Sequence, residues 1–492
     1  MSNNGGEKKK SLLRALTAEK LTEMLKEIDV SAVKGKEGEF SARARITALF
    51  DHGTFSEIGT YMNRSSDPDE AEGVICGYGA VDGRLTFAFA QDRNRMNGAF
   101  DEVAGKKIDA LYAMAVKNGA AVVGIFDSDG TCVYEGVKAM SALGRTLGAS
   151  ARAAGIVPRI ALVSGVCGGS MAVLASAFDF VLTVKASDGA GSDIYAVSPF
   201  VTGVISDPAR NGVSAVETED ENDLFATARK LLSYVPSNNA AGPVIIEEIA
   251  EPERPANVAG LTGDGLAAML GDGRDFLRLW AGWSEGLTVG FTSLGGIACA
   301  YAISDKTVND GALTPASMKA AARMIKFADA FGIPMITAVD CPGFSVTEGE
   351  NHDDAAYLEA AADLVNAVSC AANPRVAAVI GRAYGAGFIY LASKAMGNDV
   401  TFALPEACIS ALSPEASVAL VWNDRISDAD LSSTREMLET EWKEKLSSPN
   451  EAALCGEVDD IVSSDELRAR VVSALNMLLG KARTEPVRRR RN

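Results

Sequence analysis

The sequence predicts an α/β fold that is built twice. Strand and helix patterns alternate along most of the 492 residues, which predicts parallel strands joined by crossover helices. One series of strand, turn and glycine-rich turn also occurs twice: GAAVVGIFDSDG matches GIPMITAVDCPG, and GVCGGS matches GRAYGAG. The spacing recurs too, with 41 positions from Asp127 to Gly168 and 45 from Asp340 to Gly385. These recurrences predict an internal duplication.

The first half shows periodic patterns in a regular order. Residues 1–40 predict a charged helix at 18–30 and a linker, and 73–91 predicts a hairpin whose turn lies in GYGAVDGR. From there, helices and buried strands alternate. The other expected elements of this half are a helix and turn at 43–55, helices at 102–117 and 136–154, and strands at 122–126 and 160–164.

Residues 185–255 are rich in Ser, Asp, Glu, Pro and Gly, which predicts the end of the first domain and a linker with one helix at 223–235. The second half then repeats the order of the first. Its expected elements are strands at 297–303, 335–339 and 376–380, helices at 314–331 and 358–370, and a helix after RAYGAG. This organisation predicts a helical extension at 1–40, domains at 41–255 and 256–482, and a basic tail at 483–492.

Composition excludes several classes of function. The net charge of −18 argues against nucleic-acid binding, and the basic run at 488–491 is interpreted as a solvated tail, or as a docking tail for a partner protein or acidic lipid. The eight cysteines form no CxxC pair, which predicts reduced, mostly buried thiols in a cytoplasmic protein. No signal peptide is visible, and the apolar stretch at 160–184 is interpreted as a buried strand, turn and helix rather than a membrane span.

Histidine is nearly absent, which restricts the chemistry. Only His52 and His352 occur, and their polar, turn-like surroundings predict surface positions. Ser-His-Asp hydrolysis, histidine-ligated zinc and histidine acid–base relays would each rest on one of these two residues. The sequence therefore favours a reaction that does not use an imidazole.

Each half contains a strand that runs into a glycine-rich turn at the start of a helix: IALVSGVCGGSMAVLAS and VAAVIGRAYGAGFIYLAS. Free N–H groups at a helix start can bind an oxyanion, and glycine lets a ligand approach the backbone. Close packing of helix on strand would explain one such turn, but two at matched positions favour binding. Two oxyanion sites suit carboxyl transfer between biotin and a thioester, because both partners develop enolate-like oxygens and the released biotin anion can take the α-proton.

The chain resembles the biotin-dependent carboxyltransferases, the family of acyl-CoA carboxylase β-subunits and of methylmalonyl-CoA and glutaconyl-CoA decarboxylase α-subunits. In the first half the resemblance is carried by GVICGYGAVDGRLTFAFAQD, FDSDGTCVYEGV and GVCGGSMAV, and in the second by FADAFGIP, D-x-PGF and RAYGAGFIYLAS. It covers most of residues 43–422. It implies tandem crotonase-like (ClpP/crotonase) domains with a ββα-superhelix, an acyl-CoA-binding domain at 41–255 and a biotin-binding domain at 256–482.

In this family the first-half turn holds the acyl thioester oxygen. On this sequence the resemblance implies that the donors are the backbone N–H groups of Gly169 and Ser170, with Gly168 opening the turn. Gly130, in FDSDGTC, is counted among the substrate-binding residues. The usual family motif DSGGAR is DSDGTC here, and Ser170 replaces a usual glycine, so that its β-carbon would narrow the site.

The second-half turn holds the biotin oxygen in the family. The matching donors here are the N–H groups of Ala386 and Gly387, beside Gly385. Ile389, next to Phe388, matches the position that tunes acyl-chain choice, and its apolar side chain suggests a roomy pocket that accepts longer chains. A GIIRHG-like stretch that follows PGF in the family is absent.

The resemblance also implies partners. The family's carrier motif, a lysine between two methionines, is absent, so biotin would arrive on a separate biotin carboxyl carrier protein and the substrate would be a CoA thioester. Biotin carboxylase or decarboxylase membrane subunits are the other implied partners. The family's active site lies between two subunits, which implies a closed homo-oligomer, usually a hexamer. The expected location is the cytoplasm, with membrane association through partner chains.

Several functions remain open at this point. The chain is a carboxylase β-subunit, the α-subunit of a membrane-linked decarboxylase that runs the same chemistry in reverse, or a degenerate paralogue that scaffolds an active subunit. The first is the preferred interpretation, and the departures from the family pattern at 127–132, 209–223 and 345–364 are the reason that the third stays open. An unrelated crotonase-type hydratase or isomerase would need an acid–base carboxylate, for which Glu135 is the best candidate, although a helix-start position also explains that residue.

Overall fold

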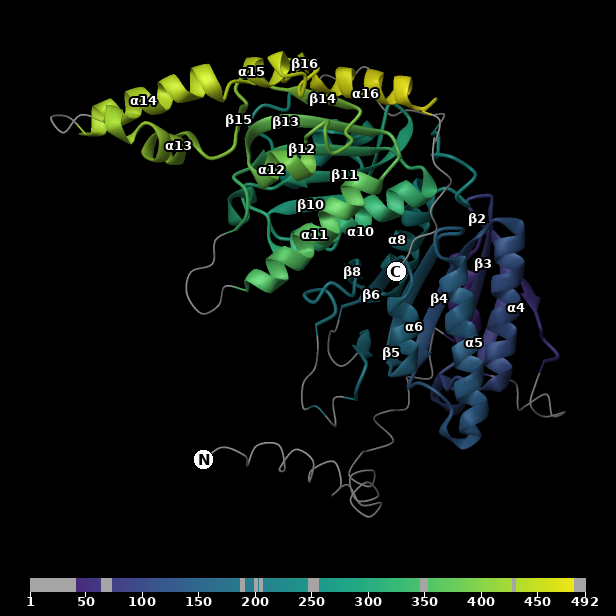
Figure 1. Ribbon diagram of the computed structural model, residues 1–492. Coiled ribbons are helices and arrows are strands. Elements are labelled where there is room, and N and C mark those ends of the chain that lie inside the picture. Colours follow the sequence, from purple (N-terminus) through teal and green to yellow (C-terminus); the bar gives the residue numbers. More distant parts are fainter. Residues whose placement is uncertain are drawn as a thin grey trace, which may run out of the picture.

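The computed structural model describes residues 41–62, 73–185, 191–198, 202, 207–246, 256–345, 353–426 and 431–481. It contains two eight-stranded sheets, one from each half of the chain. Figure 1 shows two lobes, the first half in purple and blue and the second in green and yellow. The expected α/β class and the internal duplication are both confirmed.

The first sheet has the strand order β1-β2-β3-β4-β5-β6-β8, and β7 pairs with the end of β5. Strands β1 to β3 pair antiparallel, and all later pairs are parallel. The strands are β1 Ser56–Ile58, β2 Val74–Val81, β3 Arg84–Gln91, β4 Ala121–Ser128, β5 Arg159–Gly168, β6 Phe180–Val184, β7 Asp193–Tyr195 and β8 Val216–Thr218. The helices are α3 Ala42–Leu49, α4 Glu102–Asn118, α5 Val137–Ala153, α6 Ser170–Ser176 and α8 Glu221–Tyr234.

The second sheet repeats this topology, with the order β16-β14-β13-β12-β11-β10-β9 and β15 paired with the end of β13. Its strands are β9 Phe276–Leu279, β10 Leu287–Leu294, β11 Ile297–Ser304, β12 Met335–Cys341, β13 Arg375–Tyr384, β14 Val400–Ala403, β15 Cys408–Ser410 and β16 Asp460–Ile461. Its helices are α9 Gly263–Leu270, α10 Pro315–Phe331, α11 Asp354–Cys370, α12 Ala386–Leu391, α13 Pro414–Val421, α14 Leu431–Leu446, α15 Pro449–Leu454 and α16 Leu467–Leu478.

Helices α4 and α10 are corresponding elements and begin and end alike. Asp101 caps α4, and Thr314 caps α10, because each side chain accepts an N–H group of the first turn. Both helices end at a glycine in the left-handed conformation, Gly119 and Gly332. Local sequence signals therefore set the same helix limits in both halves.

The structure adds two strands within residues 185–255. Strands β7 and β8 pair with the first sheet, as expected of the end of the first domain, but the sequence did not predict them because three-residue strands are too short to give a periodic signal. The expected hairpin at 73–91 is present as β2 and β3, and the expected helix at 358–370 begins earlier, at Asp354. The predicted helix at 18–30 and the basic run at 488–491 lie outside the described residues.

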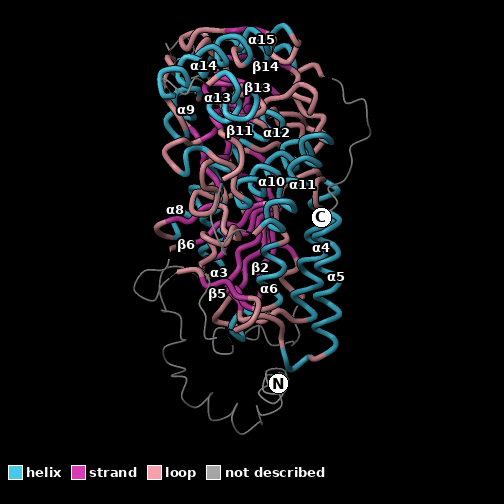
Figure 2. Tube along the Cα trace, turned by 60° about the vertical axis from the view of Figure 1, so that its left-hand side comes forward, coloured by secondary structure: helices cyan, strands magenta, loops and turns pink. Residues whose placement is uncertain are grey.

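A shared apolar core joins the two halves. The ring of Phe180, on β6, lies 4.7 Å from that of Phe327 on α10 and 5.9 Å from that of Phe291 on β10. Helix α8 packs on β5, β6 and β8 and also contacts β10. Figure 2 shows the lobes stacked end to end, with α8 and α10 near their junction. The domain limit at 255 and 256 stays a prediction.

No helix in the described ranges combines the length and hydropathy needed to cross a membrane. Among the same residues there is also no cluster of His, Cys, Asp and Glu side chains that could hold a metal ion.

Candidate active site

The first glycine turn joins strand β5 to helix α6. Strand β5 ends at Gly168 and α6 begins at Ser170, so Gly169 makes the turn, with a φ of +54°. Gly168 has no room for a side chain, because a Cβ there would lie 2.8 Å from the ring of Tyr195. The Gly169 N–H donates to the carbonyl oxygen of Tyr195 at 2.7 Å, which ties the turn to β7.

The second turn is built in the same way between β13 and α12. Gly385 makes the turn with a φ of +45°, and its N–H donates to the carbonyl oxygen of Ser410 at 3.0 Å. Helix α12 then begins at Ala386. A Cβ at Gly387 would lie 2.9 Å from Cys341, so only glycine fits beneath this turn.

The N–H groups of Ala386 and Gly387, which the sequence predicts as donors, are both available. N–H groups in the first turn of a helix have no partner within that helix. Among the residues that the structure describes, none accepts from these two. That they bind an oxyanion stays a prediction.

The first turn departs from its prediction by one residue. Gly169 corresponds to Gly385, since each carries the positive φ of its turn, and its N–H is already bonded to Tyr195. The N–H groups without an acceptor among the described residues are those of Ser170 and Met171. Aligning GVCGGS with GRAYGAG residue by residue places Gly169 opposite Gly385 and Ser170 opposite Ala386, and this alignment would have identified the pair.

A buried carboxylate fixes the strand end below the first turn. Asp127 accepts the Arg45 guanidinium at 2.7 Å and the Val166 N–H at 3.3 Å, and a Cβ at Gly165 would lie 2.5 Å from its Oδ1. Arg45 also donates to both oxygens of Glu221, at 3.1 and 2.6 Å. Burial lowers the pKa of Arg45, but Glu221 and Asp127 outweigh burial and raise it overall. Asp127 therefore supports the turn rather than facing a substrate.

Asp340 has the same position below the second turn. It accepts the Arg382 Nε at 2.7 Å and the Arg382 backbone N–H at 3.2 Å. A Cβ at Gly381 would lie 2.6 Å from its carboxyl carbon, as at the matching glycine of the first half. Arg382 also donates to both carboxylate oxygens of Asp310, at 2.6 and 2.9 Å, and this bond is the first cause of its raised pKa.

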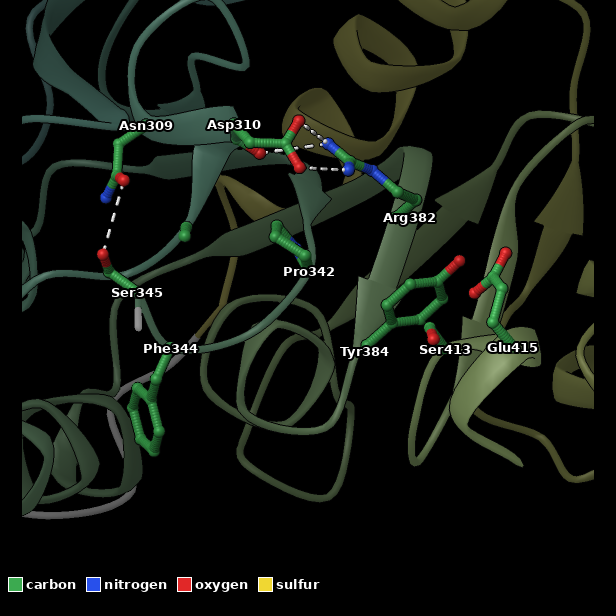
Figure 3. A pocket seen from close by; sticks show the side chains of 10 residues that line it. Asn309, Asp310, Pro342, Phe344, Ser345, Arg382, Tyr384, Ser413 and Glu415 are labelled. Atoms are coloured by element: carbon green, nitrogen blue, oxygen red, sulfur yellow. Dashed lines mark hydrogen bonds and ion pairs between the residues drawn. The ribbon is translucent and has the colours of Figure 1, made fainter. Parts of the chain in front are cut away.

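A cavity of about 540 Å³ opens beside the second turn. Figure 3 shows the Arg382–Asp310 pair on one side and the Tyr384 ring facing Glu415 on the other. Burial raises the pKa of Tyr384, and the neighbouring Cys408 raises it further, so the phenol stays protonated. The lining residues are Asn309, Asp310, Ala312, Pro342, Phe344, Ser345, Arg382, Tyr384, Ser413 and Glu415.

A second cavity, of about 650 Å³, runs along helix α6 of the first half. It reaches the first turn at Tyr195, and Phe178, Ile194 and Val213 make much of it apolar. Its other lining residues are Ala172, Val173, Ser176, Ala177, Ala196 and Asn211. An apolar chain attached to a group at the turn could lie there.

The residues predicted to shape the acyl pocket lie on α12. Ile389 is 46% exposed, and Phe388 is partly buried against the core. Val173 holds the matching position on α6 and is 53% exposed. Both glycine-turn helices thus present an apolar side chain four residues after the turn glycine.

The loop after β4 brings Gly130 to the first turn. Gly130 has a φ of +126°, and a Cβ there would lie 3.4 Å from the carbonyl oxygen of Gly168. The next residue, Thr131, places its Oγ1 2.5 Å from the Oγ of Ser170. This contact could not be predicted, because nothing in the local sequence pattern links side chains 39 positions apart.

Glu135, His52 and the cysteines have structural surroundings that agree with their expected non-catalytic roles. The Glu135 carboxylate accepts the Glu102 N–H at 2.7 Å, so a helix-start role, at α4, explains it. His52 is exposed, as expected, and His352 lies outside the described residues. The expectation of mostly buried thiols is confirmed, since Cys370 and Cys455 are the exposed ones of the eight cysteines.

Comparison with known proteins finds one family over most of the chain. Residues 34–492 match the carboxyl transferase domain. A propionyl-CoA carboxylase carboxyltransferase subunit from Haloferax mediterranei is 30% identical, over 94% of this chain and 95% of that protein. The α-subunit of methylmalonyl-CoA decarboxylase from Propionigenium modestum is also 30% identical, over 92% of this chain and 93% of that protein.

A solved structure shows the same fold. Transcarboxylase 12S, determined as a hexamer with methylmalonyl-CoA bound, superposes with a TM-score of 0.82 at 25% identity. The match covers 97% of this chain and 99% of that one. The duplicated α/β architecture described above is therefore that of transcarboxylase 12S.

Proposed function

The chain belongs to the carboxyl transferase domain family, and we propose on this basis that it moves a carboxyl group between carboxybiotin and the α-carbon of an acyl-CoA. It is a carboxyltransferase of the biotin-dependent carboxylases and decarboxylases. The observation that carries the proposal is the pair of matched turns, each with two N–H groups that no described residue occupies.

The two turns divide the reaction between them. As the α-proton passes from the acyl-CoA to the biotin that has released its carboxyl group, negative charge develops on the thioester oxygen, and the N–H groups of Ser170 and Met171 would stabilise it. The N–H groups of Ala386 and Gly387 would bind the ureido oxygen of biotin, which is a hydrogen-bond acceptor and fits a donor pair beside an open cavity. Carboxybiotin, when bound, supplies an activated carboxyl group. The protein itself needs no titrating side chain at either turn.

We further propose that the site is completed by a second copy of the chain. Helices α6 and α12 belong to different lobes of one chain and make no extensive contact with each other in the described residues. A closed oligomer would place the first turn of one copy against the second turn of another, and transcarboxylase 12S is a hexamer. Biotin would arrive on a separate carrier protein in the cytoplasm, and a biotin carboxylase or membrane-bound decarboxylase subunits would be the other partners.

The direction of transfer divides the relatives. Propionyl-CoA carboxylase forms the carbon–carbon bond and methylmalonyl-CoA decarboxylase breaks it, and both kinds of subunit match this chain equally well, at 30% identity. A decarboxylase α-subunit is therefore the second candidate. In both cases the same oxygens carry the developing charge, so the assignment of the turns is unchanged.

The decisive experiment follows carboxyl transfer to free biotin. Purified protein would be mixed with biotin and with malonyl-CoA, methylmalonyl-CoA or glutaconyl-CoA in turn, and loss of the carboxylated thioester would be measured by spectrophotometry. Turnover with one of them supports the proposal and names the acyl group. Absence of turnover with all three, from protein that is folded and oligomeric, contradicts it and favours the scaffolding paralogue.

A further inference from the structure

Two hydroxyl groups meet at the mouth of the first turn. The Oγ1 of Thr131 lies 2.5 Å from the Oγ of Ser170, and both residues are half-buried. Thr131 is held in place by the backbone: it bridges to Phe100, whose N–H donates to Gly130 O at 2.8 Å and whose carbonyl accepts the Cys132 N–H at 2.7 Å. The pair therefore joins two fixed segments.

A count of protons leaves this pair with one hydrogen bond to give. Two hydroxyl groups carry two protons, and the bond between Thr131 and Ser170 uses one of them. The part of the chain that the structure describes offers no acceptor for the other proton. The remaining O–H belongs either to Ser170, whose backbone N–H also has no acceptor among the described residues, or to Thr131, whose Oγ1 lies 2.5 Å from the Ser170 Oγ.

The second turn has no such group. The residue that matches Ser170 there is Ala386, the first residue of α12. Phe344 matches Thr131, because it bridges to Leu313 as Thr131 bridges to Phe100. The hydroxyl pair therefore distinguishes the first turn from its duplicate, which shares the rest of the backbone arrangement.

We propose that the Thr131–Ser170 pair supplies a third hydrogen-bond donor to the thioester oxygen of the acyl-CoA, beside the two backbone N–H groups. This inference rests on the proposed function. The pair transfers no proton: it donates one hydrogen bond that strengthens as the α-carbon loses its proton and charge builds on the oxygen. The bond between the two hydroxyls polarises the donor and holds it in position.

The test removes the hydroxyls without changing the shape of the site. Thr131→Val keeps the volume of the side chain, and Ser170→Ala keeps the backbone N–H. Each single variant leaves one hydroxyl that can still donate, so we expect a fall in kcat of only a few fold. The double variant should lose about tenfold in kcat at unchanged KM, because the lost bond acts in the transition state.

Two controls separate this role from a structural one. Thr131→Ser keeps the hydroxyl and loses only a methyl group, so kcat should stay close to that of the original chain. Thr47→Val, on the exposed face of α3, should change neither kcat nor Tm. A double variant as active as the original chain overturns the inference alone. The inference is also overturned if kcat falls in proportion to Tm across the variants and falls as much in Thr131→Ser as in Thr131→Val. An original chain without any carboxyl transfer overturns the proposed function and this inference together.

Discussion

The two halves of the molecule share a backbone and differ in side chains. In each, a strand passes a glycine with positive φ and enters a short helix, an aspartate beneath the turn accepts a backbone N–H, and a register shift interrupts the strand pairing at the same point. Even a run of three left-handed residues recurs after β3 and after β11: Met96, Asn97 and Gly98 in the first half, and Asn309, Asp310 and Gly311 in the second.

The side chains around this backbone have diverged. Below the first turn, Asp127 and Arg45 are almost fully enclosed, and Glu221 closes the network. Below the second, Arg382 lies at the wall of an open cavity and pairs with the exposed Asp310. The comparison teaches that the backbone supplies the same feature at both turns, a pair of N–H groups without an acceptor among the described residues, and that the side chains around the two turns differ.

Deleting one N–H from each turn should give the largest effect on the rate. Ser170→Pro and Ala386→Pro each remove the backbone N–H at the first position of a helix, where proline is tolerated, as Pro315, Pro414 and Pro449 show. Ser170→Pro also removes a hydroxyl, so its rate is compared with that of Ser170→Ala, which keeps the N–H. We expect each change to lower kcat by about 10²–10³. The measurement is initial rates of carboxyl transfer.

The control for this prediction is a proline at the start of another helix. Asp354→Pro, at the exposed start of α11, should leave the rate unchanged. If only one of the two turn variants loses activity, the turns do not share the same role and the comparison breaks at its main point.

Removing the supporting aspartates should show how differently the halves are stabilised. Asp127→Ala leaves Arg45 buried with Glu221 alone, and we expect a loss of about 3 kcal/mol in the free energy of unfolding. Asp340→Ala should cost about 1–2 kcal/mol, because Arg382 keeps Asp310 and is reached by solvent. Urea unfolding measures both, and equal losses would contradict the difference in enclosure.

How much of this the sequence could predict depends on the distance between the interacting residues. The duplication, the main strands and the glycine turns follow from local patterns, and all are present. Strands β7, β8, β14, β15 and β16 have two to four residues and leave no such pattern. The bond from Arg45 to Glu221 spans 176 positions and that from Thr131 to Ser170 spans 39, so only folding reveals them.

A change of acyl-chain preference should belong to the second half. Ile389→Asp places a charge on the exposed apolar face of α12, and we expect the ratio of kcat/KM for a longer acyl-CoA over acetyl-CoA to fall about tenfold. The matching change on α6, Val173→Asp, should alter this ratio less. A larger response at Val173 would assign the acyl chain to the cavity along α6 instead.

The smallest effect should come from exchanging one matched side chain for the other. Cys341 and Ser128 hold corresponding positions: the Ser128 Oγ lies 3.1 Å from the N–H and 3.3 Å from the carbonyl oxygen of Gly130, and the Cys341 Sγ lies 3.4 and 3.5 Å from those of Gly343. A serine hydroxyl at position 341 could therefore hydrogen-bond to both the N–H and the carbonyl oxygen of Gly343. We expect Cys341→Ser to change the free energy of unfolding at pH 7 by less than about 1 kcal/mol.

The same variant should differ from the original chain only in alkali. Burial raises the pKa of Cys341 from its ordinary value of 9.0 to about 11. Above pH 9 the thiol ionises in the unfolded chain before it does so in the folded one, so its contribution to stability is complete below pH 9 and is lost as the pH rises toward 11. Cys341→Ser removes this loss. From pH 7 to 11 the free energy of unfolding of the variant should therefore fall less steeply than that of the original chain. Parallel curves would show that the thiol is not enclosed as its neighbours suggest, and that the two halves differ beneath the turns as well as around them.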